Sequence, residues 1–281
     1  MKYANLHLHS TFSDSQLTPL QVVRIGKSLG YNALTLTDHE TDGGLNDFFT
    51  ACENEGLEYM AGIEFYGMEE GVNLHLTALD YDINDPGIRA FVKERCELMA
   101  ECTRRCVERG IKLGFIHDFT WNDVLDVCDE GAWICIDHVI RAMKQKRVMP
   151  AADDGSVLRQ NVFKGPEPKS FFPEHPTAEQ VIKMIRKASG VAVLAHPYKG
   201  QTRFVERLVG YGLNGIEISH PDLQGNDAHL ALQMADTFCL YRSGGTDHTG
   251  AMSGCGGVNA VPALQGITEE EFIILRERRL G

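Results

Sequence analysis

Short apolar runs alternate with helical segments along most of this 281-residue chain, and that alternation constrains the fold more than any other feature. Seven runs have the length and the β-branched content of strands. The predicted strands lie near residues 6–9, 33–37, 57–65, 72–80, 191–195, 215–219 and 238–243. Because helices link most of them, the pattern predicts a parallel α/β barrel of about seven strands.

Helix signals separate these runs. Thr18 and Pro19 are typical of a helix start, and Gly30 ends that helix. Further helices are expected near 45–54, 177–189, 204–211 and 227–235. From residue 86 the pattern changes to a long helical stretch, followed by few strand-like runs as far as 173. We therefore expect residues 1–85 and 174–281 to form the barrel, and residues 86–173 to form an inserted subdomain that is mostly helical.

The formal net charge of −12 argues against stable binding of long nucleic acid, because such binding needs clustered Lys and Arg. It leaves a small anionic ligand possible. No long apolar segment is present, so neither a signal peptide nor a membrane span is expected, and a cytoplasmic location is predicted. The eight cysteines show no Cys-x-x-Cys pair and are expected to be reduced. The oligomeric state is not indicated.

Residues 5–14 place two imidazoles and a carboxylate close together in the chain. Along a strand, side chains alternate between faces, so His7 and His9 point the same way and could bind one ion. Asp14 follows small polar residues that predict a loop, and it could fold back as an oxygen ligand. Taken alone, the His-x-His pair also fits an exposed strand face, so the rest of the chain has to decide.

Titratable side chains gather at the C-terminal ends of the predicted strands. They are His7, His9, Asp38, His39, Glu64, His75, His196, His220, Asp247 and His248. In a barrel these ends meet on one face, where active sites are built. Nitrogen and carboxylate ligands suit Zn²⁺, Mn²⁺ or Fe²⁺ and do not separate them. Their number exceeds what one ion uses, so we predict two or three divalent ions with a bridging carboxylate. For His220, a packing role is as well supported as a ligand role.

Metal clusters of this kind clamp phosphate oxygens and make hydroxide available for attack on phosphorus. The ordered set of motifs resembles the polymerase and histidinol phosphatase (PHP) family of metal-dependent phosphoesterases. The motifs are His7-Leu8-His9 with Asp14, Thr37-Asp38-His39, Gly62-Ile63-Glu64, His75, Leu194-Ala195-His196-Pro197 and Gly244-Gly245-Thr246-Asp247. The resemblance covers about 1–80 and 177–250, and it implies a distorted seven-stranded barrel with a trinuclear metal site.

The resemblance also implies a ligand set for each ion. It assigns the first ion to His7, His9, Glu64 and Asp247, the second to Glu64, His75 and His196, and the third to Asp14 and His39. Asp38 is not a family ligand and is expected to orient its neighbours.

One position departs from the family pattern, which closes with Asp-x-His. Here His248 directly follows Asp247, and Thr249 stands where the histidine is expected. We predict that His248 reaches the third ion, because the glycines at 244, 245 and 250 permit the chain to bend.

The insertion resembles the helical subdomain of nucleotide-directed members, in which a segment like 136–141 supplies an Arg that binds phosphate. Arg141 is the candidate here, as a bidentate clamp for a phosphate that is not cleaved. His138 and Lys199 are further candidate substrate-binding residues. A solvated surface cation is the alternative for Arg141 and Lys199.

The predicted function is hydrolysis of a small phosphorylated metabolite by metal-activated hydroxide. The substrate would be a nucleotide, a nucleoside bisphosphate, a cyclic phosphate or a sugar phosphate. Asp247 and His220 are the predicted catalytic residues, and His220 or a metal-bound water would protonate the leaving oxygen. The alternatives are a 5′-3′ exonuclease on short oligonucleotides, a histidinol phosphatase, and a metal-binding module without catalysis.

Overall fold

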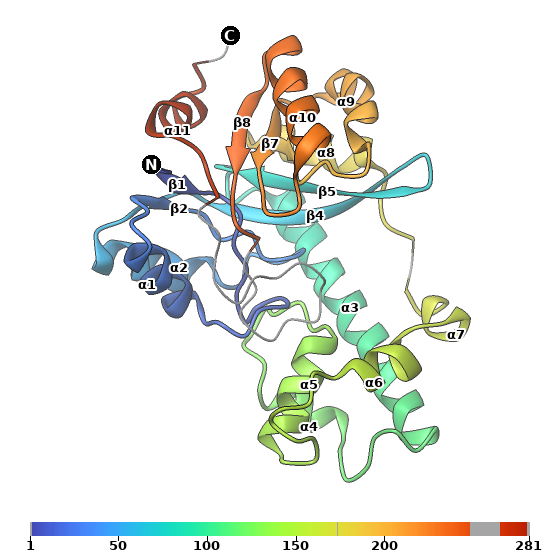
Figure 1. The fold of residues 1–281 in the computed structure, drawn as a ribbon. Helices are drawn as coiled ribbons and strands as arrows, with labels where there is room; N and C mark the ends of the chain where they lie inside the picture. The colour runs from blue at the N-terminus through green and yellow to red at the C-terminus, as the bar shows by residue number, and fades with distance from the viewer. Residues whose placement is uncertain (1, 173, 248–264, 280–281) are drawn as a thin grey trace.

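The computed structural model describes residues 2–172, 174–247 and 265–279. It has a part rich in sheet, flanked by helices, and a helical part that extends from it (Figure 1). The fold is mixed α/β, and its strands form two sheets within the described residues. The predicted closed (β/α)7 barrel therefore stays a prediction, whereas the α/β class with parallel strands is confirmed.

The first sheet is small and parallel, in the order β1-β2-β3. Its strands are β1 (Ala4–Asn5), β2 (Ala33–Leu34) and β3 (Glu58–Tyr59). They are linked by α1 (Pro19–Ser28) and α2 (Leu45–Glu55), which pack against each other. The observed strands differ from the predicted runs: β1 precedes the run at 6–9, and β2 covers only the first two residues of 33–37. The run at 57–65 is divided between β3 and the next strand, Gly62–Glu69.

The second sheet has the order β4-β5-β6-β7-β8. Its strands are β4 (Gly62–Glu69), β5 (Val72–Leu79), β6 (Val191–Leu194), β7 (Gly215–Ser219) and β8 (Tyr241–Gly244). The strands from β6 to β8 are parallel, as predicted. In contrast, β5 is antiparallel to both of its neighbours.

The antiparallel β4–β5 pair corrects the expectation of a wholly parallel sheet. Only Glu70 and Gly71 separate the two strands, and both have positive φ, at 47° and 76°. Two consecutive residues with positive φ are typical of the tight turn that twists correctly for a hairpin. A parallel connection needs a dozen or more residues, so this two-residue loop allows only the antiparallel arrangement.

Backbone hydrogen bonds link segments that follow strands of the first sheet to both edge strands of the second sheet. The Leu6 N–H donates to the carbonyl of Gly244 over 3.0 Å. At the other edge, the Glu64 N–H donates to the carbonyl of Asp38 over 3.1 Å. The segments that follow β1 and β2 are therefore held against the ends of β8 and β4, where the candidate site residues lie.

Helices cover the second sheet on one side (Figure 1). They are α8 (Ala178–Lys187), the 3₁₀ turn η2 (Gln201–Phe204), α9 (Val205–Tyr211) and α10 (Gly225–Thr237), and α11 (Glu269–Arg276) lies against β8. The main hydrophobic core includes Leu76 and Ile216 from the sheet and Val181 and Leu208 from the helices. The apolar faces predicted for these helices are therefore buried.

The segment predicted as an insertion is helical. Its elements are α3 (Pro86–Lys112), α4 (Trp121–Leu125), α5 (Ile136–Gln145), α6 (Ser156–Leu158), the π-helical turn η1 (Arg159–Phe163) and α7 (Pro166–Lys169). Ile88 and Val92, at the start of α3, belong to the main core, whereas Cys106 and Val107 belong to a second hydrophobic cluster that Phe12 also joins. Because α3 takes part in both cores, the boundaries of the insertion stay a prediction.

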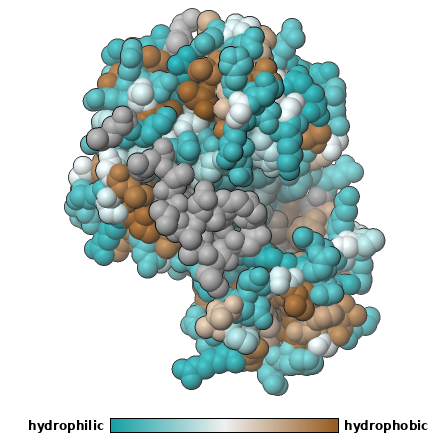
Figure 2. All heavy atoms as spheres, in the orientation of Figure 1, coloured by the Kyte–Doolittle hydropathy of each residue, from teal (hydrophilic) through white to brown (hydrophobic). Residues whose placement is uncertain are grey.

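Hydrophilic residues cover much of the face shown in Figure 2, and the apolar residues form separate patches on it. Within the described ranges, no helix is long and apolar enough to cross a membrane. The seven cysteines in these ranges are all free of disulfides.

Candidate metal centre

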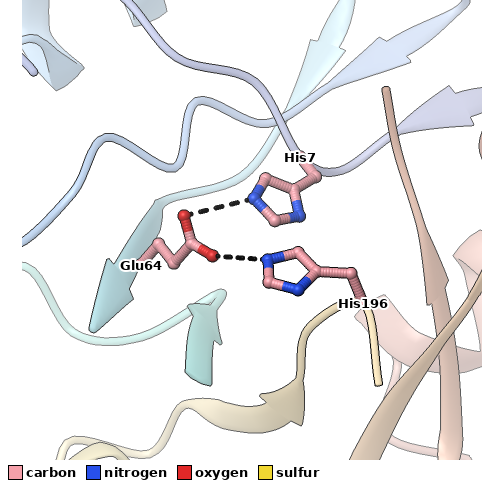
Figure 3. Close-up of side chains that lie close together, drawn as sticks. All are labelled: His7, Glu64 and His196. Atoms are coloured by element: carbon pink, nitrogen blue, oxygen red, sulfur yellow. Dashed lines mark hydrogen bonds and ion pairs between the residues drawn. The ribbon is translucent and has the colours of Figure 1, made fainter. Parts of the chain in front are cut away.

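Glu64 lies at the centre of the site and is fully buried. Its Oε2 lies 3.3 Å from Nε2 of His7 and 3.3 Å from Nε2 of His9. Its Oε1 lies 3.2 Å from Nε2 of His196 and 2.8 Å from Nδ1 of His75. Figure 3 shows His7 and His196 approaching the two oxygens of this carboxylate from different segments. The carboxylate therefore has the position that bridging two cations requires.

Asp14 and His39 lie beside this centre. His39 Nδ1 is 3.1 Å from Glu64 Oε2, and His39 Nε2 is 3.8 Å from Asp14 Oδ2. Asp14 also faces His9, with 3.6 Å between Oδ1 and Nδ1. Burial lowers the pKa of His39 to about 3, so its ring is neutral and able to act as a ligand.

Asp38 holds the loop that carries Asp14. Its carboxylate accepts hydrogen bonds from the Ser10 N–H (2.6 Å), the Ser10 hydroxyl (2.5 Å) and the Ser13 hydroxyl (2.5 Å). The side chain is buried, and its hydrogen bonds are all made with this loop. This arrangement agrees with the orienting role expected for Asp38.

Asp247 is the last residue of the cluster along the described part of the chain. Its Oδ1 lies 2.9 Å from His9 Nε2 and 3.7 Å from His7 Nε2, and its Oδ2 lies 3.3 Å from His220 Nε2. The bend that aims this side chain is at Asp247 itself, where φ is +48°. A non-glycine residue with positive φ stores strain that is common at functional sites. His248, the predicted ligand of the third ion, lies outside the described residues, as does Thr249.

Gly245 has a different role from the bend that the sequence predicted, because its φ is not positive. A Cβ at this position would lie 2.4 Å from Cβ of His7 and 2.5 Å from its backbone nitrogen. Only glycine lets the chain after β8 pass this close to the histidine segment.

Among the described residues, five buried polar atoms of the cluster make no hydrogen bond: Nε2 of His7, Nε2 of His9, Nδ1 of His39, Oε2 of Glu64 and Nδ1 of His196. Leaving such atoms unsatisfied costs about 1–3 kcal/mol each. The structure contains four groups whose potential ligand atoms lie within 4.8 Å of one another: His7, Glu64 and His196; His7, His9 and Asp247; His9, His39 and Glu64; His7, Glu217 and His220. Divalent cations would satisfy the unpaired atoms, so the residues fit a metal cluster.

The electrostatics of the site also favour positive charge. Burial alone would lower the pKa of His7, but the carboxylates of Glu64, Glu217 and Asp247 outweigh burial and raise it well above its usual value. Burial alone would raise the pKa of Glu64 and of Asp247, but the surrounding histidines hold both well below the usual range. The carboxylates therefore stay ionised and attract protons or metal ions.

Glu217 is the residue that sequence reasoning missed. It is buried on β7, and its two oxygens lie 3.3 and 3.4 Å from His7 Nδ1. A signal was present, because a carboxylate in the apolar run 215–219 is costly to bury without a partner.

A cavity of about 380 Å³ opens beside the cluster. Its walls are Asp14, His39, Tyr66, His75, Trp133, Cys135, Ile136, Asp137, Arg159, His196, Tyr198, His220, Pro221, Asp222, Thr246 and Asp247. The metal-site residues form one wall, and residues from 133–159 form another. Arg159 is the one Arg or Lys among the described residues of these walls, and its Nη2 lies 2.5 Å from Asp137 Oδ1.

None of the three predicted substrate-binding residues is among the described residues that line the cavity. Arg141 Nη2 faces the carbonyls of Thr11 and Val127 at 3.4 and 3.3 Å. His138 accepts the Cys135 N–H at Nδ1 and donates from Nε2 to the Thr11 carbonyl. Lys199 is exposed, with its ammonium 4.9 Å from the centre of the Tyr198 ring. The binding roles of these residues stay predictions.

Comparison with known families gives a match over the N-terminal part of the chain. Residues 5–112 match the family model of the PHP domain. The matched range contains His7, His9, Asp14, His39 and Glu64, which the structure brings together.

Three curated relatives of this chain have different names. A 5′-3′ exoribonuclease from Haemophilus influenzae is 28% identical over 254 residues, covering 88% of this chain and 89% of the relative. A 3′,5′-nucleoside bisphosphate phosphatase from Chromobacterium violaceum is 28% identical over 257 residues, covering 88% and 87%. A phosphoribosyl 1,2-cyclic phosphate 1,2-diphosphodiesterase from Eggerthella lenta is 26% identical over 249 residues, covering 88% and 94%.

A crystal structure from Bifidobacterium adolescentis has the same fold as this protein. That protein is provisionally described as a metal-dependent phosphoesterase. The two structures match with a TM-score of 0.80 at 24% identity, covering 98% of this chain and 96% of the other. The likeness confirms the mixed α/β fold.

Proposed function

We propose that this protein is a metal-dependent phosphoesterase of the PHP family that hydrolyses a small phosphorylated metabolite. The observation that carries the proposal is the position of Glu64, whose two oxygens face different sets of histidines beside a cavity. The curated relatives support the class of reaction, because each is named for an action on a phosphate ester bond. We also propose that the two sheets form the distorted barrel expected of the family.

Two or three divalent ions are proposed as cofactors, and Mn²⁺, Zn²⁺ and Fe²⁺ all fit the donor atoms. The residues proposed to hold them are His7, His9, Asp14, His39, Glu64, His75, His196 and Asp247, with His248 as a further ligand. Divalent ions bound in such a cluster neutralise charge on phosphate oxygens and lower the pKa of water.

His220 is proposed to hold the proton for the leaving oxygen. Its Nδ1 accepts the Asp222 N–H over 3.1 Å, so a neutral ring carries its proton on Nε2. That Nε2 faces Asp247 and belongs to a side chain in the cavity wall. Asp247 orients the donor, and the proton lies within reach of a substrate in the cavity.

The cavity supports a compact substrate with one phosphate at the cluster. Tyr66, Trp133 and Tyr198 offer aromatic surface for a ring, and Arg159 offers a cation for a second anionic group. Arg159 is better supported for this role than Arg141, because the Arg141 guanidinium faces backbone carbonyls outside the walls. We propose residues 86–173 as a substrate-binding cap on the same grounds.

Exonuclease action on short oligonucleotides is the second candidate, favoured by the relative named as an exoribonuclease. It would require a longer basic groove, whereas the described cavity has one cation and the chain has a net charge of −12. Histidinol phosphatase and a module without catalysis are weaker alternatives.

The test is a substrate screen with protein reconstituted with Mn²⁺, Zn²⁺ or Fe²⁺. The panel contains nucleoside 3′,5′-bisphosphates, nucleoside monophosphates, a 1,2-cyclic sugar phosphate, histidinol phosphate and a 5′-phosphorylated oligoribonucleotide. We expect hydrolysis of a small ester to exceed that of the oligonucleotide by at least about tenfold. Preference for the oligonucleotide would establish the exonuclease, and no hydrolysis by fully metallated protein would establish the module.

A further inference from the structure

The buried carboxylate of Glu217 is used by no step of the proposed reaction, yet it contacts two elements of the metal centre. It lies on β7, whereas His7 follows β1 and His196 follows β6. The Glu217 side chain is almost fully buried, with 1% of the residue exposed. A buried carboxylate is stable only with hydrogen-bonding or charged partners, so the contacts of Glu217 indicate its role.

The first contact is with the ring of His7. Glu217 Oε2 lies 3.3 Å and Oε1 3.4 Å from His7 Nδ1. A carboxylate only accepts hydrogen bonds, so the Nδ1 that faces it is the protonated nitrogen of a neutral ring. The lone pair is then on Nε2, the atom that has no hydrogen-bond partner and faces Glu64 Oε2. Glu217 thus selects the tautomer that can bind a cation at the cluster.

The second contact is with the backbone at His196. Glu217 Oε2 accepts the His196 N–H over 2.7 Å. His196 has φ of +26°, an unusual conformation for a residue with a side chain, and the next residues form a tight turn in which the Tyr198 N–H donates to the His196 carbonyl. Such strain persists only where the surroundings hold it. The carboxylate supplies one of those restraints and helps to aim the His196 ring at Glu64 Oε1.

We propose that Glu217 is a positioning residue of the metal centre, which sets the ring of His7 and the backbone of His196 through a single carboxylate. The inference rests on the metal cluster of the proposed function, and it does not depend on which phosphate ester is hydrolysed. Partners of this kind orient metal-binding histidines, and removing them typically weakens metal binding by about 10–100-fold.

A different reading makes Glu217 a ligand itself, since potential ligand atoms of His7, Glu217 and His220 lie within 4.8 Å of one another. The two readings differ in the number of ions bound. Loss of a positioning residue weakens the affinity at an unchanged number of ions, whereas loss of a ligand removes an ion.

The experiment measures Mn²⁺ binding to metal-free protein by calorimetry, without substrate. The variants are Glu217→Gln, whose amide oxygen can still accept both N–H groups, and Glu217→Leu, which can accept neither. Glu69→Gln is the matched control, because Glu69 is also a buried glutamate but pairs with Arg207 away from the site. We expect affinity to fall less than about tenfold for Gln, to fall about 10–100-fold for Leu, and to be unchanged in the control.

Histidine-selective ¹⁵N NMR of the metal-free proteins supplies a readout that a general packing defect would not reproduce. In the wild type, at a pH high enough to make the His7 ring neutral, the ring is expected to carry its proton on Nδ1. In Glu217→Leu the two tautomers should mix, while His138 keeps its tautomer. Unchanged affinity and tautomer in the Leu variant would overturn the proposal, and loss of one ion in Glu217→Gln would make Glu217 a ligand. A failed substrate screen would leave these binding results intact.

Discussion

At the scale of single residues, Glu64 decides what the site can do. Its two oxygens face the rings of His7, His9 and His39 on one side and of His75 and His196 on the other. Burial alone would raise the pKa of Glu64, yet His7, His39 and His75 hold it well below its usual value. The carboxylate is therefore ionised at neutral pH, and no other described side chain contacts as many of the candidate ligands.

Replacing Glu64 with Ala should abolish turnover and leave the fold largely intact, because the charge that Glu64 neutralises belongs to the bound cations. We expect kcat to fall at least about 100-fold, and metal content to fall below two ions per chain. Activity assays, metal analysis and circular dichroism on the same sample would check this. Near wild-type activity with two bound ions would contradict the cluster.

A second prediction at this scale concerns Arg159 and Arg141. Arg159→Ala should raise KM about 10–100-fold for a substrate with a second phosphate, because it removes a charge-assisted contact of about 1.5–3 kcal/mol. For a substrate with one phosphate, KM should change little. Arg141→Ala is the matched variant and should have the smaller effect, since Arg141 faces carbonyls. The reverse order would return the phosphate-binding role to Arg141.

At the scale of elements, the start of α5 joins the helical segment to the loop after the histidine pair. His138, in the first turn of this helix, donates to the Thr11 carbonyl and accepts the Cys135 N–H. The ring is buried, and burial lowers its pKa to about 3. The hydrogen bond that Nδ1 accepts from Cys135 needs the neutral ring, because a protonated ring has no acceptor, so this anchor of α5 depends on pH.

The pH dependence has a defined sign. The unfolded chain takes up a proton at His138 below about pH 6.5, whereas the folded protein does so only near pH 3, so the stability from this group is lost as pH falls from 6.5 toward 3. Between pH 7 and pH 5 the loss is on the order of 2 kcal/mol. Urea unfolding of wild type and His138→Gln at both pH values should give a smaller decline for the variant. Equal declines would show that this ring is not kept neutral.

At the scale of the whole molecule, the cluster connects segments that are far apart in the sequence. His7 and His9 follow β1 in the small sheet, while Glu64, His196 and Asp247 lie on or just after strands of the second sheet. Backbone hydrogen bonds also join the two sheets here, and the cluster contains buried polar atoms that make no hydrogen bond. Bound ions should therefore stabilise the arrangement of the two sheets as well as the reaction.

Metal removal should lower the thermal stability reversibly. At free Mn²⁺ of about 100 times Kd, one site contributes about 2.7 kcal/mol to the free energy of unfolding, which corresponds to a Tm shift of several degrees. Thermal unfolding before and after chelation, and after Mn²⁺ is added back, measures the shift. Magnesium-free buffer with EDTA followed by dialysis provides the metal-free reference. An unchanged Tm would mean that the cluster binds no ion in the folded protein.

The sequence by itself determined the local features of this protein. Alternation along an extended segment predicts that His7 and His9 face the same way, and both rings face Glu64 Oε2. Apolar runs that end in His or Asp indicate strands that bring candidate ligands to one face. Helix ends were also predictable, because the capping contacts of Thr18 and Thr177 are made with neighbouring residues. Tertiary structure decided whatever depends on distant segments. Glu217 meets His7 across 210 residues, and Arg159 reaches the cavity only because the helical segment folds over the cluster. The apolar pattern of β4 and β5 could not indicate whether the two strands are parallel or antiparallel. Their two-residue turn and the packing of the sheet impose the antiparallel arrangement.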